Sequence, residues 1–370
     1  MSLKHISHKR GESSLVLLFE TLESEYTKRY YTHFLNKFSK HIGKNFDDIL
    51  LMDKSEINQA VQTFIIEIKK EVNPNSIPTI IAPIRSFLEV NEIVLNWRLM
   101  RRFYPRRAKV SGASAWSTED IQKMLETTTS QQNKTIIHML ASTGCRIGGL
   151  EKLQLKHVRD VEHGCKMVTI YPDDFEEYYS FLTPEAAMVY DSYLKLRESK
   201  GELLNEESFV FKPKKISKHQ TGGYLNRFAM SNVVRRAVER AGLRGAMWNK
   251  RYATQACHGF RKRFNTILKS TVVMGEGVEV EKMMGHFTIK FKQDTSYFQF
   301  DKMLDAFVSG IADLTISDDH RLRYENKELI KKSQSNTAEI AKQVQKYLND
   351  MGGNFSIGNQ ESFNRLEVQE

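Results

Sequence analysis

Apolar residues in the first hundred positions recur every three or four residues, which is the spacing of one face of an amphipathic helix. The spacing is clear in three sets, Tyr30, Tyr31, Phe34, Leu35 and Phe38, then Ile57, Val61, Phe64, Ile65 and Ile68, then Ile80, Ile81, Ile84, Phe87 and Leu88. Asp53 followed by Glu56 matches a capping box, which would begin the second of these helices. Together with a short helix near residues 95–103, these patterns predict a four-helix module.

A second helical region, interrupted by β-structure, follows Ser117, which matches a helix start. Residues 166–171 and 178–182 are rich in β-branched and aromatic side chains and flank Pro172, so they predict a β-hairpin. Helical patterns precede the hairpin up to about residue 142 and follow it over 184–197, 230–241, 258–269 and 278–284. The predicted fold is therefore mainly α with a small β-hairpin or sheet, an α+β class.

The C-terminal region contains one strongly apolar stripe, made of Met303, Leu304, Phe307, Val308, Ile311 and Leu314. The pattern leaves two interpretations open, because the stripe either packs on its own domain or exchanges into a neighbouring subunit. Residues 317–350 are polar and helix-prone, with only Ile340, Val344 and Leu348 as an apolar face. Residues 351–370 are predicted to be disordered, and residues 1–12 to be a flexible arm.

A dense positive segment separates the two helical regions, and it contains Arg101, Arg102, Arg106, Arg107 and Lys109. It is either a solvated linker or a linker that follows a phosphate backbone. We favour the second interpretation, because closely spaced cations repel one another unless an anion compensates them. A second basic stretch contains Lys214, Lys215 and Lys218. The predicted division is a helical domain at 13–103, a basic linker at 104–116, a second domain at 117–316 and a helical extension at 317–350.

The composition is that of a globular chain with an acidic partner. Hydrophobic residues make up 40% and charged residues 27% of the 370 residues, and the formal net charge is +10. Because the cations are spread over several segments with aromatic residues among them, nucleic acid is favoured over a membrane surface. The apolar runs are far shorter than the roughly 20 residues that span a bilayer, and no signal-peptide pattern begins the chain. We therefore expect no membrane contact and a cytoplasmic location.

The cysteines and histidines show no metal-binding or disulfide spacing. Cys145, Cys165 and Cys257 are unpaired in the sequence, and no two histidines lie at the spacing of a zinc site. No phosphate-binding loop of the G-x-x-x-x-G-K-[ST] type occurs either. We predict neither a metal site nor a cofactor.

One set of residues carries candidate chemistry. His258-Gly-Phe-Arg261, Met284-Gly285-His286 and Tyr297 fall within 40 residues, and Arg146 follows Thr143-Gly144 far upstream. Arginine and histidine can bind and neutralise a phosphodiester, and tyrosine can attack one. Taken singly, each of these residues has an equally good structural explanation. The set therefore has to be judged together.

The ordered set Arg146, His258-x-x-Arg261, His286 and Tyr297 resembles the tyrosine recombinase (phage-type integrase) family over roughly residues 13–316. The sequence Tyr-Tyr-Ser-Phe-Leu-Thr-Pro-Glu at 178–185 is similar to the archaeal virus and mobile-element branch. The resemblance implies a core-binding domain at 13–103 and a catalytic domain at 117–316. It also implies attachment sites on double-stranded DNA as partners, and a homotetramer assembled on DNA through the C-terminal helix.

The resemblance also implies a role for each residue. Arg146 and Arg261 would stabilise the charge of the transition state, and Tyr297 would attack DNA phosphorus to form a 3′-phosphotyrosyl bond. His258 would assist proton transfer, and His286 would donate to a non-bridging oxygen. Because the covalent link conserves the bond energy, the reaction needs no cofactor.

Two positions depart from the family pattern. The acidic residue expected three positions after Arg146 is replaced by Gly149, and the hairpin turn at 172–177 contains no catalytic Lys. Lys166, at the start of the first hairpin strand, is the nearest candidate for that Lys. These departures leave two alternative functions open, a type IB topoisomerase-like nicking and closing enzyme, and a cleavage-deficient DNA-binding accessory protein with the same fold.

Overall fold

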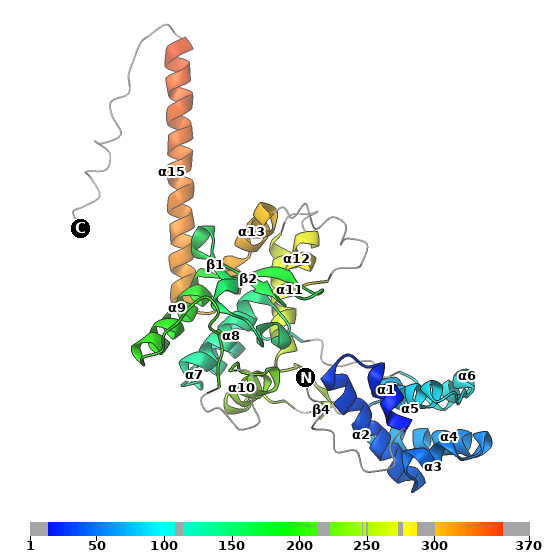
Figure 1. Ribbon diagram of the computed structural model, residues 1–370. Helices are drawn as coiled ribbons and strands as arrows, with labels where there is room; N and C mark the ends of the chain where they lie inside the picture. The colour runs from blue at the N-terminus through cyan, green and yellow to red at the C-terminus, as the bar shows by residue number, and fades with distance from the viewer. Residues whose placement is uncertain are drawn as a thin grey trace. The chain divides into compact units, whose positions relative to one another are not determined.

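The computed structural model describes residues 14–107, 114–213, 223–245, 247–248, 251–272, 277–286 and 300–350, without the side chains of Trp248, Arg251 and 348–350. The predicted arm, the predicted disordered tail, Tyr297 and the basic residues Lys109, Lys214, Lys215 and Lys218 lie outside these ranges. The chain forms two compact units, one of Met1–Gly112 with Ala246–Ala253 and one of Ala113–Gly245 with Thr254–Glu370. Figure 1 gives the element labels that are used below.

The first unit is helical, and most of its apolar stripes form one core. Its elements are α1 (Ser14–Glu20), α2 (Glu25–Ile42), α3 (Phe46–Leu50), α4 (Lys54–Glu71), η1 (Pro74–Ser76), α5 (Ile77–Val90), α6 (Trp97–Met100), η2 (Arg101–Phe103) and the hairpin β4 (Met247–Trp248) and β5 (Arg251–Tyr252). The predicted capping box is confirmed, because the Asp53 N–H donates to the Glu56 carboxylate at 3.3 Å. Phe38, Phe64 and Phe87 are fully buried, and each such side chain contributes about 1.5–3 kcal/mol of hydrophobic stabilisation.

The second unit combines helices with a three-stranded antiparallel sheet of order β1-β2-β3. Its elements are α7 (Thr118–Glu126), α8 (Gln131–Thr143), η3 (Ile147–Leu150), η4 (Leu155–His157), β1 (Val158–Asp160), η5 (Glu162–Gly164), β2 (Lys166–Ile170), β3 (Tyr178–Leu182), α9 (Pro184–Ser199), α10 (Arg227–Arg240), α11 (His258–Thr271), α12 (Gly277–Met283), α13 (Phe300–Val308), α14 (Ile311–Leu314) and α15 (Asp318–Asp350). The predicted hairpin is confirmed, since Val168 pairs with Ser180 and Ile170 with Tyr178. The fold class is confirmed as well, although β1 was not predicted because three residues are too few to show alternation.

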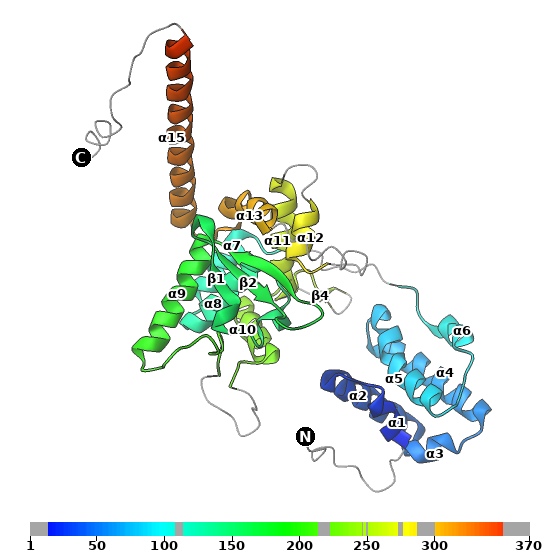
Figure 2. The ribbon, with the colours of Figure 1, turned by 45° about the horizontal axis from the view of Figure 1, so that its top comes forward.

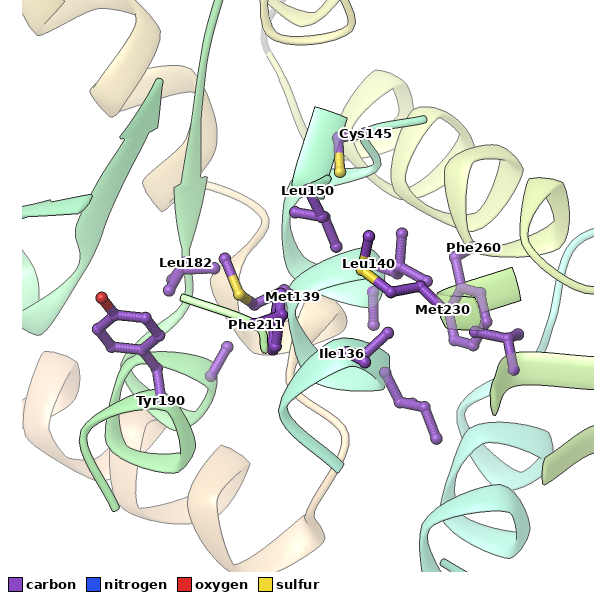
Figure 3. Packing of buried hydrophobic residues seen from close by; sticks show 14 of the residues in the cluster. Ile136, Met139, Leu140, Cys145, Leu150, Leu182, Tyr190, Phe211, Met230 and Phe260 are labelled. Atoms are coloured by element: carbon purple, nitrogen blue, oxygen red, sulfur yellow. The ribbon is translucent and has the colours of Figure 1, made fainter. Parts of the chain in front are cut away.

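Helix α8 lies at the centre of the second unit. Every residue from Thr135 to Thr143 is buried, as expected for a helix that is covered on all sides. Leu140, Ile136 and Met139 pack against side chains from the sheet, α9, α10 and α11, and Figure 3 shows this cluster. The core therefore fixes the C-terminal end of α8, where the candidate Arg146 follows.

The apolar stripe at 303–314 packs on its own unit. Met303 and Phe307 of α13 and Ile311 of α14 are fully buried in a cluster with Phe264 and Leu268 of α11. Helix α15 follows as one uninterrupted helix of 33 residues, which Figure 2 shows from a second direction. Tyr324 near its start packs against the core, whereas Leu329, Ile330 and Ile340 are exposed. None of the helices described is both long and apolar enough to cross a membrane.

The segment between α14 and α15 is fastened to the body of the unit. The buried carboxylate of Glu185 on α9 accepts the N–H groups of Ile316 at 2.7 Å and Ser317 at 2.9 Å. Arg263 on α11 donates to the Leu314 C=O at 3.2 Å. Charge-assisted hydrogen bonds of this kind are stronger than neutral ones, so the root of α15 is held by its own chain.

A buried histidine in the core makes stability depend on pH. Burial lowers the pKa of His138 on α8 to about 4, although the nearby Glu185 carboxylate opposes the shift, and its Nδ1 has no hydrogen-bond partner among the described atoms. In the unfolded chain the pKa returns to about 6.5, so the unfolded state binds more protons between pH 6.5 and 4. The native state should therefore lose about 3 kcal/mol as the pH falls through this window.

The variant His138→Leu isolates that contribution. Its free energy of unfolding should change less between pH 7 and pH 4 than that of the wild type, by about 3 kcal/mol. Urea unfolding followed by circular dichroism at both pH values measures the difference. An equal loss of unfolding free energy in the two proteins would show that His138 does not cause the pH dependence, since the other titrating groups are present in both.

Candidate active site

The first candidate residue is positioned by a sharp helix end. Helix α8 terminates at Gly144 in the left-handed conformation, with φ of 59°. A Cβ atom at this position would lie 2.5 Å from the Phe264 ring, so both the conformation and the close packing require glycine. The chain then turns into η3, and Arg146 occupies the residue before that short helix.

Arg261 joins three segments that are distant in the sequence. Its guanidinium is buried, and Nη1 donates to the Gly144 C=O at 2.9 Å. Nη2 donates to the Met284 C=O and lies 2.8 Å from Nε2 of His286. The permanently charged guanidinium of Arg261, on α11, thus contacts both the end of α8 and the segment that follows α12. A buried cation with neutral partners alone is suited to an incoming anion.

The contacts of His286 define its tautomer. Its Nδ1 lies 2.6 Å from the carboxylate of Glu281, while Nε2 faces Arg261. A guanidinium can only donate, so Nε2 must accept and Nδ1–H must donate to Glu281. Glu281 also forms an ion pair with Lys269. Partial burial raises the pKa of Glu281, but the hydrogen bonds from Lys269 and His286 outweigh it, so the pKa is lowered and the carboxylate stays ionised.

His258, the first residue of α11, is a neutral acceptor near the same cations. Desolvation of its ring lowers its pKa first, and the charges of Lys262, Arg261 and Arg146 lower it further. The imidazole is therefore neutral at neutral pH and can take up a proton. Arg146 and Arg261 are therefore near enough to His258 for their charges to act on its ring. His286 completes the group through its contact with Arg261.

Arg146 is the cation of this group that remains open to solvent. Its side chain makes no hydrogen bond or ion pair with a residue in the described ranges. Its exposed guanidinium is a candidate to bind an external anion. Arg146, His258, Arg261 and His286, which the sequence predicted as one set, thus form one cluster, which we call the Arg–His cluster.

Lys166 contacts a different group of residues. Its ammonium forms ion pairs with Asp160 at 2.6 Å and Asp191 at 3.1 Å, and it lies 5.9 Å from the centre of the Tyr190 ring. Burial lowers its pKa, but the hydrogen bonds to the two aspartates outweigh this effect and leave the pKa raised. The structure brings Lys166 into contact with β1 and α9, and within the described ranges it has no hydrogen bond or ion pair with the Arg–His cluster. Its catalytic role remains a prediction.

The hairpin explains why position 149 is glycine. A Cβ atom at Gly149 would collide with the Cγ2 atom of Ile170, and one at Gly148 would lie 3.1 Å from the Tyr171 hydroxyl. A side chain at position 149 would therefore require Ile170 to move. Tyr171 lies over the turn after Arg146, and the buried Tyr178 hydroxyl lies near Arg261. We had interpreted both tyrosines only as strand residues, since alternation along a strand does not reveal what its far end touches.

Of the predicted DNA-binding residues, the structure describes only the four arginines between residues 101 and 107. Arg101, Arg102, Arg106 and Arg107 are all exposed. Tyr297 and the lysines of both basic stretches lie outside the described ranges. Within those ranges, no three histidine, cysteine, aspartate or glutamate side chains gather in a way that could hold a metal ion.

Solved structures share this fold at low sequence identity. The Tn1549 transposon integrase in complex with transposon right-end DNA aligns at 14% identity with a TM-score of 0.53, covering 79% of this chain and 97% of that chain. A lambda integrase dimer bound to a COC′ core site aligns at 14% identity with a TM-score of 0.50, covering 74% and 92%. A lambda integrase tetramer bound to a Holliday junction aligns at 14% identity with a TM-score of 0.50, covering 74% of this chain and 75% of that chain. No protein-family model and no curated protein sequence matches the chain.

Proposed function

We propose that this chain is a site-specific DNA recombinase, an integrase of the tyrosine recombinase type, from an archaeal virus or other mobile element. It would act on double-stranded attachment sites in the cytoplasm of the host. The observation that carries the proposal is the Arg–His cluster, which combines two guanidiniums with two imidazoles. The fold shared with DNA-bound integrases supports it.

Each residue of the Arg–His cluster would have its own role in the proposed reaction. A scissile phosphate would bind between Arg146, which makes no hydrogen bond or ion pair with a described residue, and the buried Arg261. Tyr297 would attack the phosphorus and give its proton to His258, whose lowered pKa keeps it able to accept. Glu281 holds the His286 ring through Nδ1 and so keeps Nε2 against Arg261. A 5′-hydroxyl from a second strand would then reverse the step and release the tyrosine.

A trapping experiment tests the function. Duplexes that carry a nick just downstream of randomised sequence release the short 5′-hydroxyl fragment after cleavage, so a 3′-phosphotyrosyl adduct accumulates. We expect a protein–DNA species that survives denaturation, with phosphotyrosine on the peptide that contains Tyr297. Sequencing of the trapped DNA would identify the attachment site. No adduct with any duplex would leave the cleavage-deficient accessory protein as the better explanation.

The type IB topoisomerase alternative shares the covalent step but needs no paired sites. Relaxation of supercoiled plasmid without strand exchange would favour it. Exchange of flanking DNA between two recovered sites would favour the recombinase.

The proposed homotetramer rests on α15. Because α13 and α14 are buried in their own unit and Glu185 fastens residues 316–317, the exposed part of the C-terminus begins at α15. A chain that ends at Ser317 should cleave a single site at the wild-type rate but assemble poorly on two sites. Native gel electrophoresis on paired-site DNA measures this, and unchanged assembly would exclude α15. A chain ending at Asp350 is the control.

The linker arginines should contribute the salt-dependent part of DNA binding. Each phosphate contact adds about 0.9 to the slope of log K against log salt. Replacing Arg101, Arg102, Arg106 and Arg107 by Ala should therefore lower that slope by up to about 4 and weaken binding to all sequences alike. Fluorescence anisotropy at several salt concentrations measures it. A variant with an unchanged slope would show that the segment is only a solvated linker.

A further inference from the structure

If the chain cleaves DNA as proposed above, the departing 5′-oxygen needs a proton, and the Arg–His cluster has no group that supplies it. When the P–O5′ bond breaks, the departing oxygen becomes a strongly basic alkoxide unless a donor protonates it. Arg146 and Arg261 do not release protons at neutral pH. His258 is neutral, and Nε2 of His286 accepts from Arg261. A further acidic O–H or N–H group is therefore required.

Tyr171 places a hydroxyl over the turn that follows Arg146. It follows β2 directly, and its ring covers the turn after Arg146, since a Cβ atom at Gly148 would lie 3.1 Å from its Oη and one at Gly149 would lie 3.8 Å from its Cε2. Its ring centre is 6.3 Å from that of Tyr178, which borders Arg261. Two consecutive glycines thus allow the phenol to approach the backbone beside the cluster.

The backbone of Tyr171 is held in an unfavourable conformation. Its φ is 54°, in the left-handed region that bulky side chains rarely adopt, and a residue before proline normally stays extended. The Asp174 N–H donates to the Tyr171 C=O at 3.1 Å and closes the turn over Pro172. Strained residues of this kind persist only where the surroundings enforce them, and they concentrate at functional sites.

The surroundings of Tyr171 act on its pKa in both directions. Burial and the neighbouring Cys145 raise the pKa of Tyr171, while Arg146 and Arg261 act in the opposite direction. The phenol is therefore protonated at neutral pH, and two guanidiniums stand near enough to stabilise the phenolate once the proton has left. The Tyr171 hydroxyl makes no hydrogen bond within the described ranges, so its proton is free for a ligand.

We propose that Tyr171 is the proton donor to the departing 5′-oxygen. As the Tyr297 oxygen bonds to phosphorus and passes its proton to His258, the P–O5′ bond breaks and O5′ takes the proton of Tyr171. The Tyr171 phenolate remains beside Arg146 and Arg261. In the rejoining step the attacking 5′-hydroxyl returns its proton to Tyr171, and His258 returns one to Tyr297, so both tyrosines are regenerated.

A sulfur-substituted substrate separates proton donation from other roles. In a duplex with a 5′-bridging phosphorothiolate the leaving group is a thiolate, which departs without a proton because a thiol is far more acidic than an alcohol. Tyr171→Phe keeps the ring that packs on Gly148 and Gly149 and removes only the hydroxyl. Adduct formation by this variant should slow about 10²–10⁴-fold on the oxygen substrate and return to near the wild-type rate on the sulfur substrate.

The other outcomes are equally informative. An unchanged rate on the oxygen substrate would overturn the proposal, and so would a slow rate on both substrates, since that indicates positioning alone. A sulfur-rescued defect in Lys166→Met with none in Tyr171→Phe would assign the proton to Lys166 instead. Adduct mapped to Tyr171 would make it the nucleophile and also overturn the proposal. If the wild type forms no adduct with either substrate, it is the proposed function that fails.

A matched control lies on the same hairpin. Tyr179 is on β3, and its hydroxyl donates to Glu177 at 3.2 Å rather than bordering the cluster. Tyr179→Phe removes one phenol from the hairpin in the same way and should cleave both substrates at the wild-type rate. A defect in this control that matched the one in Tyr171→Phe would indicate a general effect of hairpin stability and would count against the donor role.

Discussion

Replacement of Tyr297 by Phe is expected to abolish covalent adduct formation while DNA binding is retained. The phenol oxygen is the atom that would bond to phosphorus, and Phe has the same ring without it. Removal of an enzyme's nucleophile typically lowers the rate by more than about 10⁴-fold. The DNA contacts expected at Arg101–Arg107 and at Arg261 are unaffected, so the dissociation constant should stay within about twofold of the wild-type value.

The measurement is a suicide-substrate assay beside an anisotropy titration on the same DNA. Loss of adduct together with loss of binding would not satisfy the prediction, because it would indicate a damaged fold. Persistence of the adduct with Phe at position 297 would show that another residue is the nucleophile. Thr295 and Tyr171 would then be the first positions to map by mass spectrometry.

Arg261→Lys should lower the rate of adduct formation about 10²–10³-fold, which corresponds to the roughly 3–4 kcal/mol lost with one preorganised donor. Lysine keeps the positive charge but has a single donor centre in place of the planar fork. It cannot bind the Gly144 C=O, the Met284 C=O and His286 together. The His286 ring loses one of its two fixed partners, so a phosphate would meet a less ordered site. Single-turnover kinetics with saturating DNA measures the effect.

Arg263 provides the matched control for that experiment. It lies on the same helix, is 3% exposed like Arg261, and also donates to backbone C=O groups, at Leu314 and Asp313. Arg263→Lys should destabilise the fold by about 1–3 kcal/mol, since it weakens buried hydrogen bonds. Its effect on the cleavage rate should be small at a temperature where it remains folded. Equal rate losses in the two variants would show that Arg261 acts only through stability.

The cluster also explains one departure from the family pattern in physical terms. Gly149 stands where an acidic residue was expected, and the hairpin turn lacks a lysine. Ile170 occupies the space that a side chain at position 149 would need, and the next residue, Tyr171, lies over the same turn. The glycine and the tyrosine are therefore one packing solution. From the sequence alone, the missing acidic residue at 149 and the missing lysine in the hairpin turn had no visible connection.

Local patterns were sufficient for much of the fold. The three-to-four spacing of apolar residues, the capping box at Asp53 and the β-branched runs around Pro172 depend on interactions between near neighbours in the chain, so they could be interpreted from the sequence. The set of Arg146, His258, Arg261 and His286 was identified by its order and spacing. Each of these signals is local or follows the linear order of the chain.

Tertiary structure decided the rest, because long-range packing has no linear signal. The stripe at 303–314 was compatible with two partners, and only the contacts with Phe264 and Leu268 identify its own unit as the one it packs against. Lys166 was chosen by its distance along the chain from the hairpin turn, but its register on β2 turns it toward Asp160 and Asp191. The role we propose for Tyr171 likewise depends on a close approach between residues 148 and 171. Sequence order thus determined which residues are candidates for the chemistry, and packing decided which of the described ones meet.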